Sequence, residues 1–160
     1  MTEQVRGRRH EFFGVIILMF ALLLLVFLIT FDPADPSFNS ASHRERPDNR
    51  IGPFGAYAAD CLFQAFGYAA YLLLPPLIVL SLKLMFGRQI GSGLTRVMGI
   101  LLFIASSSTI LHLLLSGRGE TAFKPGGFTG VVLADDLTSA LGVTGAWILA
   151  VGGLVLGILA

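Results

Sequence analysis

The sequence is poor in charge. Asp, Glu, Lys and Arg make up 13% of its 160 residues, whereas a soluble domain carries roughly 25%. Hydrophobic residues make up 54% and the mean hydropathy is +0.78. This composition excludes a disordered chain and argues against a water-soluble domain. The net charge of +1 gives no basic surface for wrapping nucleic acid.

The sequence is equally poor in chemistry-bearing residues. Its one cysteine, Cys61, excludes an internal disulfide framework and a cysteine-cluster zinc site. The three histidines, His10, His43 and His112, lie in separate segments, so no local metal site is indicated. No phosphate-binding loop, no H-E-x-x-H and no G-x-S-x-G occurs. We therefore expect no catalytic, cofactor-binding or metal-binding residues in this chain.

Long uncharged stretches are what the chain has instead. A bilayer core of about 30 Å needs roughly 20 helical residues, so these stretches predict an all-α integral membrane protein. The predicted tail covers residues 1–11, and the membrane domain covers residues 12–160. Its four transmembrane helices are expected at about residues 12–31, 56–86, 94–115 and 145–160.

The loop before the fourth helix carries its own helical pattern. Apolar and polar residues alternate at near-helical spacing over Phe128–Leu141. This pattern predicts a short helix that either lies at the membrane interface or re-enters the membrane shallowly. Asp135 and Asp136 argue against deep burial there, because a charge at mid-bilayer costs about 2.5–3.5 kcal/mol. The fourth helix would end at the last residue, so we expect the chain to be the N-terminal part of a longer protein.

The basic residues favour cytoplasmic termini. The predicted cytoplasmic side holds six Lys and Arg residues, crowded into a short tail and a short connector, and the other side holds five. Both termini are then cytoplasmic, since four spans return the chain to its starting side. Cysteine labelling from outside is expected at Ser40 and Ala122 and not at Thr2 or Gln89.

The start of the second span is the main candidate for a structural or partner contact. Gly52 and Gly55 flank a proline, and Ala56 and Ala59 share one helical face that allows close packing. Asp60 is expected within two turns of the helix start, where the helix dipole favours a carboxylate, and within hydrogen-bond reach of a neighbouring loop. An ion-pathway role is the alternative. Pro75-Pro76 predicts a kink, and further close packing is expected at Gly67, Ala70 and Gly153-x-x-x-Gly157.

Two polar features of the third span leave alternatives open. His112 is either a proton-relay or substrate group or a neutral imidazole bonded to a neighbouring helix or the headgroup region. The run Ser106–Thr109 either lines a pore or, as is more usual, bonds carbonyls four residues back or a neighbouring helix.

Several segments resemble one protein family. Residues Asn49–Gly67 read NRIGPFGAYAADCLFQAFG, which is similar to the pattern N-x-x-G-x-x-G-A-x-x-A-D-x-L-x-x-x-F-G of FtsK/SpoIIIE-type DNA translocases. The pattern continues through Ala70–Pro75. Asp35-Pro36-Ser37, Gly126–Gly130 and Leu141–Ala146 also resemble the family, so the likeness covers essentially the whole chain.

The resemblance implies a membrane anchor and assembly domain of a translocase that couples chromosome segregation to bacterial cell division. It implies a multi-pass protein of the cytoplasmic (inner) membrane at the division septum. The expected partners are the lipid bilayer, other septal membrane proteins and further copies of the chain, without direct nucleic-acid contact. ATP and magnesium belong to a motor domain outside these residues. A small transporter or channel subunit is the main alternative, and an intramembrane enzyme has no visible paired catalytic residues.

Overall fold

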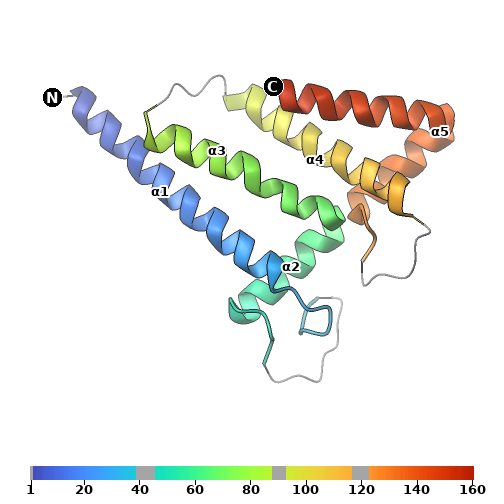
Figure 1. Ribbon diagram of the computed structural model, residues 1–160, viewed down its shortest axis with the longest axis horizontal. Coiled ribbons are helices and arrows are strands. Elements are labelled where there is room, and N and C mark those ends of the chain that lie inside the picture. Colours follow the sequence, from blue (N-terminus) through green and yellow to red (C-terminus); the bar gives the residue numbers. More distant parts are fainter. Residues whose placement is uncertain (1, 39–45, 88–92, 117–122) are drawn as a thin grey trace.

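The computed structural model describes residues 2–38, 46–87, 93–116 and 123–160 and is helical throughout, without a strand in these ranges (Figure 1). The elements are α1 (Thr2–Ile29), α2 (Gly52–Phe66), the 3₁₀ helix η1 (Gly67–Leu73), α3 (Leu74–Met85), α4 (Gly93–Leu115) and α5 (Gly127–Leu159). Four stretches are long and apolar enough to cross a membrane: His10–Ile29, Gly52–Met85, Gly93–Leu115 and Gly127–Leu159. The predicted fold class is therefore confirmed.

The first helix extends beyond the predicted span. Residues 2–11, expected as a tail, form the first turns of α1. Helix α1 lies alongside α3 (Figure 1), and the two backbones come close together at Gly14. A Cβ atom there would lie 2.9 Å from both the Met85 nitrogen and the Ser81 oxygen. Glycine at this position lets the two backbones pack directly.

The second span, predicted over residues 56–86 with a kink at Pro75-Pro76, is bent, and the interruption begins at Gly67. Helix α2 begins earlier, at Gly52, with Pro53 in its first turn. A proline suits this position because amide hydrogens in the first turn have no partner within the helix, so the one that proline lacks is not missed. It ends at Gly67, whose φ of 60° and ψ of −141° interrupt the helix. The chain continues as η1, and Pro75 and Pro76 lie in the first turn of α3. The prolines thus permit a new helix after the bend.

The fourth span is also bent. Helix α5 consists of two helical arms that meet in a sharp kink at Gly142, whose φ of 71° and ψ of 171° are not helical. Its first arm, residues 127–141, is the short helix predicted in the third loop. Its second arm returns along α4 (Figure 1). Gly153 and Gly157 lie in this contact, where a Cβ atom on Gly157 would be 2.7 Å from the Phe103 nitrogen.

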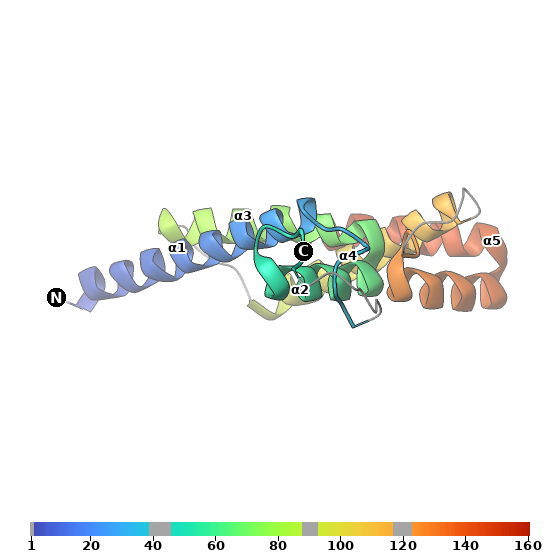
Figure 2. The ribbon, with the colours of Figure 1, turned by 90° about the horizontal axis from the view of Figure 1, so that it is seen from below.

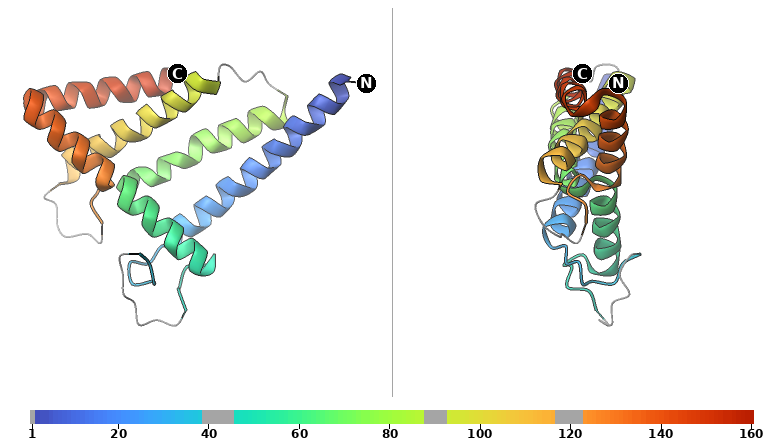
Figure 3. Two further views of the ribbon diagram at one scale, coloured as in Figure 1. Left: turned by 180° about the vertical axis from the view of Figure 1, so that it is seen from behind. Right: turned by 90° about the vertical axis from the view of Figure 1, so that its right-hand side faces the viewer.

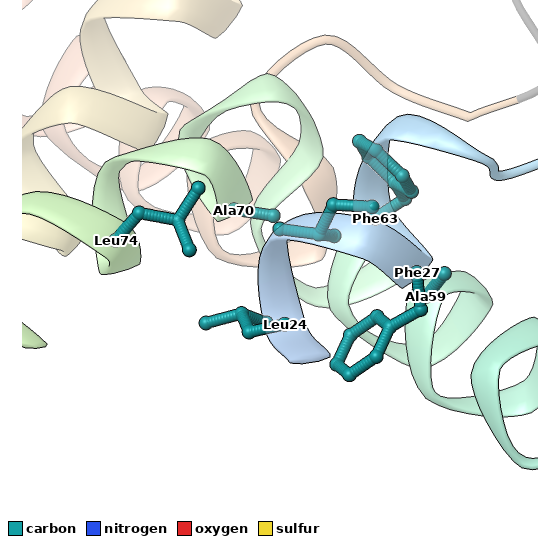
Figure 4. Close-up of a cluster of buried hydrophobic side chains, with 7 residues drawn as sticks. Leu24, Phe27, Ala59, Phe63, Ala70 and Leu74 are labelled. Atoms are coloured by element: carbon teal, nitrogen blue, oxygen red, sulfur yellow. The ribbon is translucent and has the colours of Figure 1, made fainter. Parts of the chain in front are cut away.

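The helices form an elongated, flat arrangement. Figure 2 shows the molecule from its narrow side, with α1 at one end and the bend of α5 at the other. The views in Figure 3 show that the N- and C-terminal ends reach the same edge. The core cluster lies where α1, α2, η1 and α3 meet (Figure 4). It consists of Leu24, Phe27, Leu28, Ala59, Phe63, Ala70 and Leu74.

Candidate functional site

The start of α2 is held to the end of α1 by one buried amide. Asn49, 3% exposed, donates from Nδ2 to the carbonyl oxygens of Phe27 (2.9 Å) and Thr30 (3.3 Å). Its Oδ1 accepts from the Ile51 amide at 3.1 Å. The last turn of a helix has carbonyls without intrahelical partners, so Asn49 satisfies such groups and fixes the angle between α1 and α2.

The carboxylate of Asp35 holds the end of the loop that joins α1 to α2. Asp35 is buried and accepts hydrogen bonds from the amides of Asp48 (2.7 Å) and Asn49 (3.0 Å). Asp32, Asp35 and Asp48 each bring a carboxylate oxygen within 4.8 Å of the others. Oxygen ligands of this kind can hold a hard cation, but the hydrogen bonds of Asp35 already account for its burial.

The predicted contact residues Gly52, Gly55 and Ala56 occupy this junction. Gly52 has φ +73°, a left-handed conformation that glycine adopts without steric cost. Gly55 packs against the Asn49 side chain, and a Cβ atom there would also be 2.7 Å from the Ile51 Cβ. Ala56 is 1% exposed. The small side chains therefore make room for the Asn49 amide.

Ala59 and Asp60 lie one to two turns further along α2. Ala59 is fully buried in the core cluster. Asp60 is the ninth residue of α2, beyond the two turns expected, because the helix begins at Gly52. It is 5% exposed, and no residue in the described ranges forms a hydrogen bond or ion pair with it. The predicted bond to a neighbouring loop is thus absent from these ranges.

Gly67 makes a close backbone contact between the first and second halves of the chain. A Cβ atom on Gly67 would lie 2.5 Å from the Gly127 nitrogen and from the Pro125 carbonyl carbon. The Tyr68 amide donates to the Pro125 oxygen at 2.9 Å. Nearby, the ring of Phe63 stacks on Phe123 with centroids 4.6 Å apart. The third loop therefore contacts the bend after α2, rather than the start of α2.

The polar run of α4 is occupied by backbone contacts. Ser107 and Thr109 donate to carbonyls four residues back, at 2.7 and 2.9 Å. Ser108 donates across to the Phe66 carbonyl at 3.3 Å. His112 packs beside Gly126 and Gly130, and its buried Nδ1 has no hydrogen-bond partner among the described residues. The run joins helices, as its sequence favours, and shows no pore within the part of the chain that the structure describes.

Two surface grooves accompany the helices. One, of about 500 Å³, lies between α1, α2 and α3 and is lined by apolar side chains and Cys61. The other, of about 530 Å³, lies between α3, α4 and the end of α5 and includes Lys83 and Arg96. The apolar groove offers no charged side chain to a transported solute. The second places two cations beside the C-terminal residue.

Comparisons with known proteins match this chain to one membrane region of one protein family. The family described as the 4TM region of DNA translocase FtsK/SpoIIIE matches residues 6–160. The chain is 32% identical to DNA translocase FtsK of Pseudomonas aeruginosa over 155 residues, which cover 90% of the chain and 19% of that protein. It is 30% identical to the Pseudomonas putida protein of the same name, covering 90% and 18%. It is 32% identical to DNA translocase FtsK of Azospirillum brasilense, over 86% of the chain and 22% of that protein.

The chain spans about a fifth of the length of these curated relatives. The matched segment is the four-helix membrane region, so the motor domain of a translocase is not in this chain. No solved structure matches it. The sequence motif Asn49–Gly67 gave no sign of the aromatic contact between Phe63 and Phe123 or of the Asp35 carboxylate cluster.

Proposed function

Because the chain belongs to the family of FtsK/SpoIIIE four-helix membrane regions, we propose that it anchors a DNA translocase at the bacterial division septum and takes part in assembly there. One observation carries the proposal: the family match runs through all four apolar helices of a multi-pass membrane protein. The buried residues Asn49 and Ala59 lie inside the motif that resembles the family.

The proposed topology has both termini in the cytoplasm of the cell, on the inner face of its inner membrane. The ends of α1 and α5 lie at one edge of the molecule (Figure 3), and Lys83 and Arg96 lie near the C-terminal residue. Basic residues accumulate on the cytoplasmic side of membrane proteins. Labelling at Thr2 from outside should therefore fail. The other three predicted labelling positions, Ser40, Gln89 and Ala122, lie outside the described residues.

The proposed partners are the bilayer, other septal membrane proteins and further copies of the chain. Nucleic acid is not a proposed partner, because a net charge of +1 leaves no clustered phosphate-neutralising surface. ATP and magnesium would act in the motor domain and not in these residues. A transporter is less well supported, since the Ser107 and Thr109 hydroxyls are bonded within α4.

The proposal is tested with a fluorescent fusion in dividing cells and two matched substitutions. Ala59 is fully buried in the core cluster, whereas Ala58 lines the apolar groove. Ala59→Leu should disturb the packing of α1 against α2 by about 1–3 kcal/mol and reduce septal localisation. Ala58 is half-buried at the edge of the same cluster, so Ala58→Leu should reduce septal localisation less. Uniform membrane fluorescence of the unsubstituted fusion would contradict a septal role.

A further inference from the structure

The two bent spans carry the same sequence pattern. Residues 52–67 and 127–142 both read G-x-x-G-x-x-x-A-D-x-L-x-x-A-x-G, with seven identities in sixteen positions and a constant separation of 75 residues. The identical pairs are Gly52 and Gly127, Gly55 and Gly130, Ala59 and Ala134, Asp60 and Asp135, Leu62 and Leu137, Ala65 and Ala140, and Gly67 and Gly142.

The glycines at the two ends of the pattern share the sign of φ, and the alanines share their burial. The first glycine of each pattern has positive φ, +73° at Gly52 and +61° at Gly127. The last glycine does too, +60° at Gly67 and +71° at Gly142, and each of these ends a helical arm. The alanines are both buried, at 0% for Ala59 and 1% for Ala134. A chance coincidence of residue types would not by itself give positive φ at both ends of each pattern.

The equivalence extends to the helices that precede each pattern. In the first half, Gly14 of α1 packs on Met85 at the end of α3; in the second, Gly99 of α4 packs on Ala160. Met85 and Ala160 are again 75 residues apart. The chain therefore consists of two helix-plus-bent-helix units, residues 14–85 and 99–160, which follow the same course in Figure 1.

The two units are joined head to tail. The bend of the first unit, at Gly67, contacts the start of the second unit's bent helix, at Gly127. A Cβ atom on Gly127 would lie 2.5 Å from the Ala65 carbonyl carbon and the Phe66 nitrogen. The Tyr68 amide bonds the Pro125 carbonyl across this contact at 2.9 Å. Unlike parts of the repeat thus meet, which is a heterologous contact.

Within the described part of one chain, this head-to-tail contact leaves two surfaces without a partner: the bend of the second unit and the start of the bent helix of the first. At the second unit's bend, Gly142, and at the first unit's start, Gly52, a Cβ atom would meet no atom within 4 Å. Figure 1 shows the start of α2 at the bottom of the molecule and the bend of α5 at its upper right, far from each other. Around Gly142, Ala140 and Val143 are exposed. Lipid could cover apolar groups of this kind, so exposure alone does not identify their partner; the internal contact does.

We propose that Gly142 of one copy receives the Gly52 region of a second copy of this chain, repeating the internal contact between Gly67 and Gly127. The bond corresponding to Tyr68 and Pro125 would run from the Val143 amide to the Arg50 carbonyl of the next copy. Repetition of a heterologous contact closes a ring or extends a filament. This deepens the self-association in the proposed function by naming its two surfaces, and it rests on the repeat rather than on septal localisation.

Cross-linking in native membranes tests the contact. In a Cys61→Ser background, differently tagged chains carrying Arg50→Cys and Val143→Cys are co-expressed and oxidised with copper phenanthroline. Mixed-tag dimers are expected, and a chain with both substitutions should give a ladder of oligomers. Arg50 and Val143 are both exposed, so neither substitution disturbs the core. The control Ile148→Cys, at another exposed position, should give no mixed dimer with Arg50→Cys.

A steric variant completes the test. Ala140→Trp, on the exposed counterpart of Ala65, should reduce the ladder at least tenfold, whereas Ile148→Trp should preserve it. Absence of mixed dimers, or dimers formed by either single-cysteine chain alone, overturns the proposal. Loss of the ladder in Ala140→Trp with septal fluorescence intact would retain both proposals, and a ladder in a chain that never reaches the septum would refute only the septal one.

Discussion

Replacing Gly67 with alanine should destabilise the chain more than any other single added methyl group at a bend. Two separate terms contribute. The backbone at Gly67 has φ 60° and ψ −141°, a region almost reserved for glycine, which costs an L-residue about 1–3 kcal/mol. The added Cβ would also lie 2.5 Å from two backbone atoms, the Gly127 nitrogen and the Pro125 carbonyl carbon.

The steric term follows from that distance. The Pro125 oxygen is nearer still, so reaching an ordinary contact of 3.4 Å needs a separation of at least 0.9 Å (3.4 − 2.5), and none of these backbone atoms can rotate away. Overpacking of this kind costs about 1–3 kcal/mol, so the sum is about 2–6 kcal/mol. At tenfold per 1.4 kcal/mol, the unfolding equilibrium constant should rise by about 30-fold to more than 10⁴-fold.

Two glycines serve as matched controls. Gly87 has φ +61° but open space around it, so Gly87→Ala isolates backbone strain, at about 1–2 kcal/mol. Gly152 is helical with open space, so Gly152→Ala should be neutral or slightly stabilising. Unfolding is followed in mild detergent titrated with dodecyl sulfate, by fluorescence of Trp147, the one tryptophan. Equal destabilisation by Gly67→Ala and Gly87→Ala would refute the steric argument.

Three further predictions concern the loop, the second helix pair and catalysis. Asn49→Ala should lower the free energy of unfolding by about 1–3 kcal/mol, because two carbonyls lose their donor. Arg50→Ala, a change at an exposed neighbour, should alter it by less than about 0.5 kcal/mol. Equal effects of the two substitutions in the same titration would contradict the role of Asn49 in holding α1 to α2. Gly157→Leu should separate α4 from α5 and raise thermal aggregation, since even a Cβ would lie 2.7 Å from the Phe103 nitrogen; Gly152→Leu should not, and the reverse order would count against this packing. The purified chain should hydrolyse no ATP above a detergent blank and bind duplex DNA without a steep salt dependence; nucleotide turnover would show that a catalytic group has been missed.

The charge gaps predict four spans because a bilayer tolerates so few charges, and that constraint is strong. They do not predict bends, since the chain stays apolar on both sides of Gly67 and Gly142. Pro75-Pro76 pointed to a break, but a proline at a helix start marks where a helix can begin. The break itself lies at Gly67, where the Pro125 backbone approaches, and only the fold brings those residues together.

For the candidate site as well, the sequence indicates the kind of contact but not the partner. Small residues such as Ala59 indicate close packing, but their neighbours depend on the angle that Asn49 sets between α1 and α2. The repeat is present in the sequence, yet Gly, Ala and Leu coincide easily in membrane proteins. The positive φ values at both ends of each copy distinguish it from chance.

The bond between Tyr68 and Pro125 has a consequence for biogenesis. While residue 125 is still unsynthesised, the Tyr68 amide cannot bond the Pro125 carbonyl. A backbone group without a partner costs several kcal/mol in hydrocarbon, so the amide would then bond a carbonyl of its own helix and the second span would enter the bilayer without its bend. The bend would form last, when the second hairpin supplies the Pro125 carbonyl, which makes the shape of an early span depend on a segment synthesised later.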